Sequence, residues 1–236
     1  MTRKKYAVAA ALAAGVLLLG GCEMLNQESW EPQESDAILV GEDGTITEYV
    51  HEKLDEAYYN AAELQSMITS EVSEYNSAHT AESVTVKKFE TEGQEVSLEL
   101  VYASAEDFAA FNNVEFYYGS LINAQLSGYL FDVNYKKVIN GVVQGSNFSG
   151  SEVIKEMDKE VMVVRAPLEV KVPGKVLYTS ANADVLAPDV IDATGRDDQE
   201  DEGLVLPSNA VYKGKKKSFE ETAAANRVYI IFEKNY

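Results

Sequence analysis

Residues 82–104, ESVTVKKFETEGQEVSLELVYAS, alternate apolar and polar side chains on either side of a short polar turn. The apolar positions of each half share one side: Val84, Val86 and Phe89 in the first half, and Val96, Leu98, Leu100 and Tyr102 in the second. A period of two is the pattern of a strand with one buried face. We therefore predict an antiparallel hairpin, joined through TEGQ, whose apolar face is turned to a core.

Further strands are expected on both sides of this hairpin. Residues 37–50 combine the apolar run AILV, the turn-like GEDG and the β-branched TITEYV, which predicts a second hairpin. Residues 168–180, LEVKVPGKVLYTS, alternate across a Pro-Gly turn and predict a third. The segments VMVV at 161–164 and RVYIIFEK at 227–234 are apolar enough to be strands inside a sheet.

Helical periodicity is clearest in residues 61–77. The apolar residues of this segment recur at helical spacing: they are Leu64, Met67, Ile68, Val72 and Tyr75. Asn60 followed by Glu63 has the spacing of a capping box at the start of this helix. Ser104 with Asp107 predicts a second capped helix, and shorter helices are expected at 121–128 and 149–158.

Hairpins interrupted by short helices, without regular alternation of strand and helix, predict the α+β class. We expect antiparallel sheets built from hairpins, with a few short helices packed on them. Residues 114–148 have weaker strand patterns around the helical LINAQLSG, and Ala183 to Leu206 is the segment expected to form a long loop. A single domain is predicted over residues 37–236.

The N-terminus has the order of charge and hydropathy of a secretory signal. MTRKK supplies three positive charges, and the apolar stretch from Tyr6 to Leu19 follows without a charged residue. A membrane-spanning helix needs roughly 20 apolar residues, and this stretch is 14 residues long. We therefore interpret residues 1–21 as a signal peptide.

The stretch ends at Leu19-Gly20-Gly21-Cys22, which contains the only cysteine of the chain. These four residues resemble the lipobox of bacterial lipoproteins, and the chain as a whole resembles small uncharacterised lipoproteins of Gram-positive bacteria. The resemblance implies that the Cys22 thiol receives a diacylglyceryl group, and that the lipoprotein signal peptidase recognises Leu19, Gly20 and Gly21 and cleaves before Cys22. Residues 22–36 would then form the lipid anchor and a tether.

Composition limits the partners of such a protein. The chain carries a net charge of −19, which becomes about −22 once Arg3, Lys4 and Lys5 are removed with the signal peptide. This charge repels nucleic acid and anionic headgroups, so we expect no nucleic-acid partner and attachment to the membrane through the acyl chains alone. With Cys22 acylated, no intramolecular disulfide is available to the fold.

An acidic stretch at residues 197–202 has part of a calcium-loop pattern. From Asp198, carboxylates occupy positions 1, 3 and 5, and Gly203 occupies position 6. Position 12 is Asn209 instead of a bidentate glutamate, so we interpret the stretch as a solvated loop and expect no metal. The basic run at 213–217 is interpreted as a charged hairpin tip or edge, with an anionic polymer or lipid as the alternative.

No motif points to catalysis, and we expect neither a catalytic residue nor a cofactor. The two histidines, His51 and His79, have no second ligand at metal spacing. The nucleophile, zinc and phosphate-loop motifs are absent. The tyrosine doublets 58–59 and 117–118 favour core packing, because adjacent side chains on a strand point to opposite faces.

The sequence therefore predicts a lipid-anchored protein on the extracytoplasmic face of the cell membrane. The preferred interpretation of its function is a non-catalytic binding or interaction module with an envelope partner. Two alternatives remain open: a lipoprotein that binds a solute or cell-wall polymer in a tyrosine-lined cleft, and an envelope hydrolase that uses a carboxylate pair. An exposed apolar patch would favour the interaction module.

Overall fold

The computed structural model describes residues 30, 32, 35–54, 60–79, 82–156, 158–194, 211–212, 215–216 and 227–234. The chain divides into two compact units, Met1–Glu31 and Pro32–Tyr236, and the fold described below lies in the second. The predicted anchor residues 19–22 and the acidic stretch 197–202 lie outside the described residues. None of the described helices is both long and apolar enough to cross a membrane.

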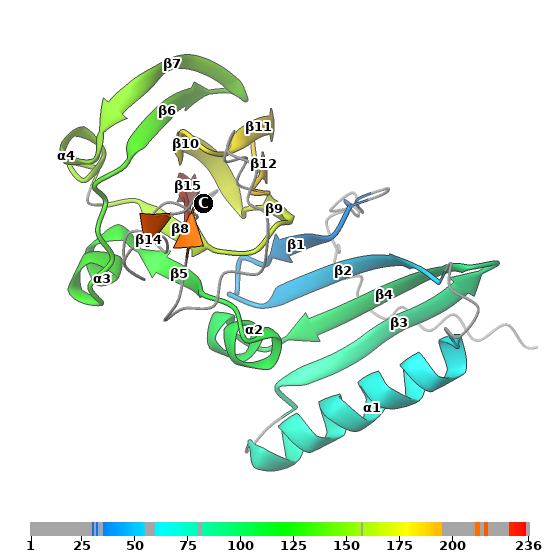
Figure 1. Ribbon diagram of the computed structural model, residues 1–236. Coiled ribbons are helices and arrows are strands. Elements are labelled where there is room, and N and C mark those ends of the chain that lie inside the picture. Colours follow the sequence, from blue (N-terminus) through cyan, green and yellow to red (C-terminus); the bar gives the residue numbers. More distant parts are fainter. Residues whose placement is uncertain are drawn as a thin grey trace, which may run out of the picture. The chain divides into compact units, whose positions relative to one another are not determined.

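The first sheet has seven strands in the order β11-β12-β9-β1-β2-β4-β3 (Figure 1). All its strand pairs are antiparallel except β1 with β9. Its strands are β1 (Ala37–Val40), β2 (Ile46–Lys53), β3 (Val84–Glu92), β4 (Glu95–Tyr102), β9 (Glu169–Lys171), β11 (Asp184–Ala187) and β12 (Val190–Asp192). The hairpins predicted at 37–50 and 82–104 are β1–β2 and β3–β4, so both predictions are confirmed.

The second sheet has six strands in the order β5-β8-β15-β10-β6-β7, and every strand pair in it is antiparallel. Its strands are β5 (Phe116–Ser120), β6 (Asn134–Ile139), β7 (Val142–Ser149), β8 (Glu160–Val164), β10 (Gly174–Ser180) and β15 (Val228–Lys234). β15 lies between β8 and β10, as its uninterrupted apolar run predicted. A separate two-stranded pair joins β13 (Val211–Tyr212) to β14 (Lys215–Lys216).

Four helices accompany the sheets in the described part of the chain: α1 (Ala61–Ala78), α2 (Ala105–Asn112), α3 (Leu121–Leu126) and α4 (Gly150–Val153). The Asn60 side chain accepts hydrogen bonds from the backbone N–H groups of Ala62 and Glu63, which confirms the predicted start of α1. Ser104 caps α2 in the same way through the N–H of Asp107. The α+β class with antiparallel sheets and short packed helices is confirmed.

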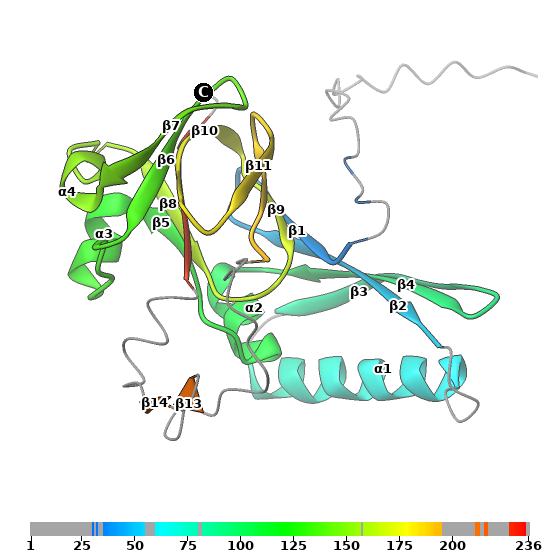
Figure 2. The ribbon, with the colours of Figure 1, turned by 45° about the horizontal axis from the view of Figure 1, so that its top comes forward.

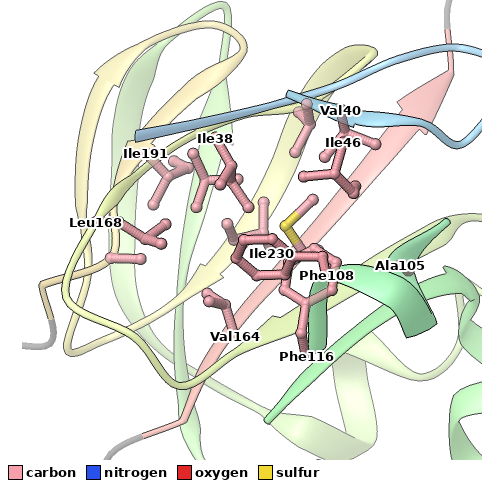
Figure 3. Packing of buried hydrophobic residues seen from close by; sticks show 14 of the residues in the cluster. Ile38, Val40, Ile46, Ala105, Phe108, Phe116, Val164, Leu168, Ile191 and Ile230 are labelled. Atoms are coloured by element: carbon pink, nitrogen blue, oxygen red, sulfur yellow. The ribbon is translucent and has the colours of Figure 1, made fainter. Parts of the chain in front are cut away.

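The larger core lies between the two sheets and beneath α1 and α2. β1 and β2 supply Ile38, Val40 and Ile46, which meet Phe108 of α2 and Ile230 of β15 (Figure 3). The alternation seen in the sequence produces this core, because every second side chain of β4 turns to the same face and is buried there. Helix α1 covers the β3 end of this face, where Val72 is its most buried apolar residue (Figure 2).

A smaller core lies on the other face of the six-stranded sheet, under α3 and α4. It contains Leu121, Ala124 and Val153 from the helices, together with Tyr135 and Tyr229 from the strands. The adjacent Tyr117 and Tyr118 point to opposite faces of β5, because Tyr117 packs on this smaller core and Tyr118 packs on the larger one. The core-packing interpretation of this doublet is therefore confirmed.

Four local predictions were wrong. β9 and β10 belong to different sheets, so residues 168–180 do not form a hairpin: β9 pairs with β1 and β12, whereas β10 pairs with β15 and β6. The expected loop from Ala183 begins instead with the β11–β12 hairpin. The helix expected over 149–158 ends at Val153, and Met67 of α1 is 52% exposed although its spacing placed it on the apolar face.

Candidate functional site

The tip of the β6–β7 hairpin is a two-residue turn, Asn140-Gly141. Both residues have positive φ, 50° and 78° respectively, as a type I′ turn requires. Asparagine tolerates the left-handed conformation better than most residues, and glycine adopts it without steric cost. The Asn-Gly pair therefore determines where the hairpin turns and which side chains lie beside its tip.

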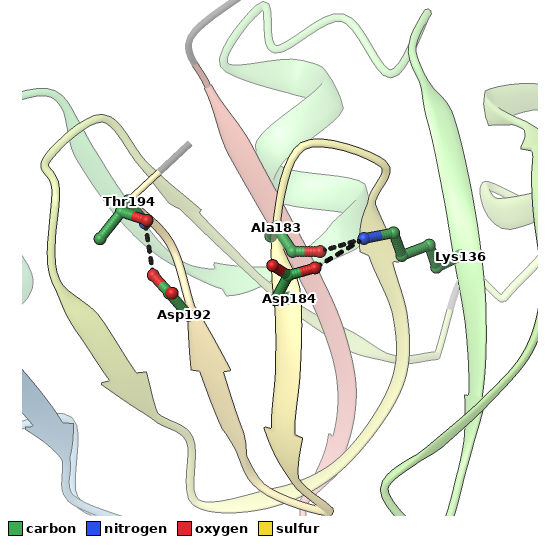
Figure 4. Close-up of polar contacts among 5 residues, drawn as sticks. All are labelled: Lys136, Ala183, Asp184, Asp192 and Thr194. Carbon is green, nitrogen blue, oxygen red and sulfur yellow. Dashed lines mark hydrogen bonds and ion pairs between the residues drawn. The ribbon is translucent and has the colours of Figure 1, made fainter. Parts of the chain in front are cut away.

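Contacts with the β11–β12 hairpin hold this tip in place. A Cβ atom on Gly141 would lie 2.8 Å from the backbone nitrogen of Pro188, so the two turns are in close contact. Below the tip, the Lys136 ammonium donates to the Ala183 carbonyl oxygen at 2.6 Å and pairs with the Asp184 carboxylate at 3.1 Å (Figure 4). The two hairpins therefore present a joint surface.

Four large apolar side chains are exposed at this junction. Their exposed fractions are 49% for Ile139, 59% for Val142, 43% for Val143 and 53% for Leu186. We call these four residues the hairpin patch. Ile139 pairs with Val142 across the ladder, and Val143 pairs with the buried Val138, so these two pairs lie on opposite faces of the hairpin and the patch surrounds its tip. Clustered exposed apolar side chains beside polar surface are typical of contact sites.

Two residues of the hairpin patch, Val142 and Val143, lie on a sheet edge. β7 is the outermost strand of its sheet, and its eight residues include no charged side chain. The outermost strand β3 of the other sheet carries Lys87, Lys88, Glu90 and Glu92. Charges on an edge strand prevent pairing with other chains, and β7 lacks them.

Two register shifts interrupt the pairing of β6 with β7. Such bulges twist an edge strand and limit the length over which another strand can pair with it. The apolar tip is therefore a better contact surface than the full length of the edge.

The charge pattern of the sequence contained a signal for this region. Only Asp132, Lys136 and Lys137 are charged between Phe116 and Ser151, in a chain of which 25% of the residues are charged. The stretch contains β5, α3, β6, β7 and the start of α4. Counting charges in windows along the chain would have identified this uncharged stretch, whereas hydrophobic periodicity identified only its strands and short helices.

A buried polar cluster lies on the apolar face of the first sheet. The Tyr102 hydroxyl donates to the Glu48 carboxylate, and the Asn112 amide donates to the Tyr102 hydroxyl at 3.1 Å and to the carboxylate at 3.4 Å. Burial raises the pKa of Glu48, although both hydrogen bonds act to lower it, and the charge of Asp36 raises it further. Burial and the Glu48 charge also raise the pKa of Tyr102, so the phenol keeps its proton.

We expect Glu48→Gln to change how the stability of the protein depends on pH. Between the ordinary carboxyl pKa of 4.5 and the raised value, the folded state keeps a proton that the unfolded state has released. Wild-type stability therefore falls as pH rises through this window and is level above it. Glutamine does not titrate, so the difference in melting temperature between the variant and the wild type should change in favour of the variant from about pH 5 to about pH 8.

Melting curves of both proteins at the two pH values test this expectation. The exposed change Glu90→Gln controls for the loss of one negative charge from an acidic chain. A constant difference between wild type and Glu48→Gln at both pH values would show that Glu48 titrates normally in the folded protein.

The remaining predicted residues lie apart from the hairpin patch. The ring of His79 stacks on Tyr75 at the end of α1, and its Nδ1 atom lies 2.7 Å from the Tyr75 carbonyl oxygen. His51 lies on β2, where its Nδ1 atom is 3.3 Å from the Ser35 carbonyl oxygen. Within the described ranges, no three His, Cys, Asp or Glu side chains are grouped as metal ligands.

A shallow hollow runs along α1. The described residues that line it are Ala62, Gln65, Ser66, Thr69, Ser70, Ser73, Glu74 and Ser77. None of these is a tyrosine, although the solute-binding alternative predicted a tyrosine-lined cleft. The hollow therefore gives that alternative no support.

The comparisons with known proteins leave the site to be interpreted from its own geometry. No known protein family, curated protein or solved structure matches this chain.

Proposed function

We propose that this protein is a lipid-anchored, extracytoplasmic interaction module that binds an envelope protein through the hairpin patch. The observation that carries the proposal is the group of four exposed apolar side chains around the tip of the β6–β7 hairpin, two of which lie on the uncharged edge strand β7. The preferred interpretation of the sequence specified an exposed apolar patch as its distinguishing feature. The resemblance of Leu19-Gly20-Gly21-Cys22 to a lipobox supports the anchor.

The patch has the energetic properties of a contact site. Fully burying a Val, Leu or Ile side chain is worth about 1.5–3 kcal/mol, and about half of each patch side chain is still exposed in the folded protein. A partner that covers all four would gain several kcal/mol from apolar contact alone. In interfaces, a few residues commonly supply most of the binding energy.

Membrane anchoring would allow a patch of only four side chains to be sufficient for binding a partner. A diacyl group at Cys22 gives the two chains that stable membrane attachment requires. Confinement to the membrane raises the effective concentration of the module near other membrane components, so a weak contact becomes productive. The acidic surface supports this arrangement, because it disfavours nonspecific attraction to anionic polymers away from the patch.

The two alternatives have less support from the described residues. A hydrolase would need two carboxylates facing a substrate, and the one carboxyl with a raised pKa and substantial burial, Glu48, is engaged by Tyr102 and Asn112. A solute binder would need an aromatic cleft, and the hollow on α1 is lined by small and polar residues.

Photo-crosslinking in the native membrane tests the proposed contact. A benzophenone side chain at Gln144, an exposed position on β7 beside the patch, should give a discrete adduct with one partner. The double change Val142→Lys and Val143→Lys should remove that adduct, because it places two charges in an apolar interface. The matched control carries the probe at Lys87 of β3, an outermost strand of the first sheet, and should give no adduct.

The proposal would fail if the Gln144 adduct survived both lysines, or if the Lys87 probe captured the same partner. A melting curve of the double variant near that of the wild type shows that the lysines act on the interface and not on folding.

A further inference from the structure

A second exposed apolar group lies on α3 and the turn after it. Ile122 is 40% exposed, Leu126 81% and Leu130 73%. These two leucines have the largest exposed fractions among the large apolar side chains that the structure describes. On the opposite side of α3, Leu121 and Ala124 are fully buried on the six-stranded sheet. We call Ile122, Leu126 and Leu130 the leucine knob.

The start of the knob is held by hydrogen bonds. The Ser120 hydroxyl accepts from the N–H of Asn123 at the start of α3. At its end, the N–H of Tyr129 donates to the Ala124 carbonyl oxygen at 3.1 Å.

A hydrogen bond joins the C-terminal end of the knob, at Leu130, to the six-stranded sheet. The Tyr229 hydroxyl, from the central strand β15, donates to the Leu130 carbonyl oxygen at 2.7 Å. Hydrogen bonds therefore fix both ends of the segment that carries the leucine knob, so its leucines lie on a turn of defined conformation.

The knob is surrounded by uncharged sequence. No charged residue occurs from Phe116 to Phe131, although acidic residues are abundant elsewhere in the chain. Beside the knob, the rings of Tyr117 and Tyr129 lie 5.2 Å apart between centroids. Tyrosine favours the boundary between hydrocarbon and water, where its ring is buried and its hydroxyl is hydrated. The Arg227 guanidinium, which lies 5.8 Å from the centroid of the Tyr129 ring, is paired with Glu115, so these two charges add no net charge beside the knob. Anionic headgroups therefore repel an acidic protein less on this side.

The length of the tether indicates what can cover the leucine knob. If Cys22 carries the lipid, nine residues lie between it and Pro32, the start of the folded unit, and an extended chain from Cys22 to Pro32 spans roughly 35 Å. The folded unit therefore stays within reach of the bilayer surface. A lipid surface is always present at that distance.

We infer that the leucine knob inserts into the interface of the bilayer to which the chain is anchored, so that lipid covers Leu126 and Leu130. This inference rests on the proposed lipid anchor at Cys22. Docking of the knob orients the folded unit and leaves the hairpin patch, which lies on the β6–β7 and β11–β12 hairpins, for a protein partner.

A single fluorescent label tests the inference on the full acylated chain. Because Cys22 would be acylated, a cysteine introduced by Leu126→Cys is the only free thiol, and it can carry an environment-sensitive dye. The chain is reconstituted in vesicles of phosphatidylcholine and phosphatidylglycerol, some with nitroxide groups on the acyl chains. We expect a shift of the emission to shorter wavelength and several-fold stronger quenching by nitroxide lipids than for a label introduced by Glu90→Cys, on the charged strand β3.

A second variant separates insertion from proximity. Adding Leu130→Asp to the labelled chain places a carboxylate in the knob, and the quenching at position 126 should fall to that of the Glu90→Cys control. Quenching that persists unchanged in the chain with the Leu130→Asp substitution would overturn the inference.

The remaining outcomes separate the two proposals. An acylated, vesicle-bound chain whose label at 126 stays in water overturns the insertion alone. A label that is shielded in native membranes but not quenched by nitroxide lipids also overturns it, because a protein then covers the knob. A chain recovered without an acyl group overturns the anchor, and the insertion with it.

Discussion

Cys22→Ala should abolish lipid attachment completely and leave the chain as an uncleaved precursor. The diacylglyceryl group is transferred to a thiol, and alanine offers no nucleophile, so no partial activity is expected. In bacterial lipoproteins, which the sequence LGGC resembles, cleavage follows acylation, so the signal peptide of residues 1–21 should remain attached. Metabolic labelling with a fatty-acid analogue, followed by mass measurement of the recovered chain, detects both effects.

A relocated thiol is the matched control for this prediction. Ser127→Cys in the Cys22→Ala background restores one cysteine on the exposed turn after α3. It should take up no label, because the reaction depends on Leu19, Gly20 and Gly21 preceding the thiol. Labelling of Cys22→Ala itself, or equal labelling of the relocated thiol, would contradict the lipobox interpretation.

Gly150→Ala should cause the largest loss of stability among small substitutions in the folded unit. A Cβ at position 150 would lie 1.6 Å from the carbonyl oxygen of Phe131 and 2.6 Å from its carbonyl carbon. Both are backbone atoms, so no side-chain rotation relieves the overlap, and either α4 or the chain before β6 must move. We expect the free energy of unfolding to fall by at least about 3 kcal/mol, which lowers the melting temperature by roughly 6–12 °C.

Gly145→Ala is the matched control for this overlap. It adds the same methyl group in β7, where the nearest atom is Cε2 of Phe148 at an ordinary contact distance of 3.4 Å. Its melting temperature should stay within about 2 °C of the wild type. Equal melting temperatures for the two variants would show that the backbone of Phe131 does not confine Gly150.

Features that depend on neighbours in the chain could be predicted. The alternation in residues 82–104 and the turn TEGQ specify the β3–β4 hairpin, because strand pairing across a tight turn is set locally. Asn60 and Ser104 specify the starts of two helices, because a cap bonds to N–H groups two or three residues away. These contacts are encoded within one short window of sequence.

Features that depend on contacts with distant parts of the chain could not be predicted from the sequence. The Pro-Gly sequence at 173–174 has the composition of a hairpin turn, yet the chain crosses there from one sheet to the other. The partner of β9 is β1, about 130 residues earlier in the chain, so this pairing leaves no signal in the local sequence. In the same way, Glu48 looked like one polar residue in an alternating strand, and only folding brings Tyr102 and Asn112 to its carboxylate.

Local patterns in the sequence predict the α+β class, the main hairpins and the capped helices, and the sequence contains the motif on which the proposed membrane anchor rests. Which apolar side chains stay exposed depends on how distant segments of the chain pack together. Val138 and Val143 are paired neighbours of equal hydrophobicity, yet one is 1% and the other 43% exposed. Periodicity shows that a face is apolar, but whether that face is buried depends on what the rest of the chain packs against it. The hairpin patch and the leucine knob are two places where no described residue covers the apolar side chains, and Met67 of α1 is a third.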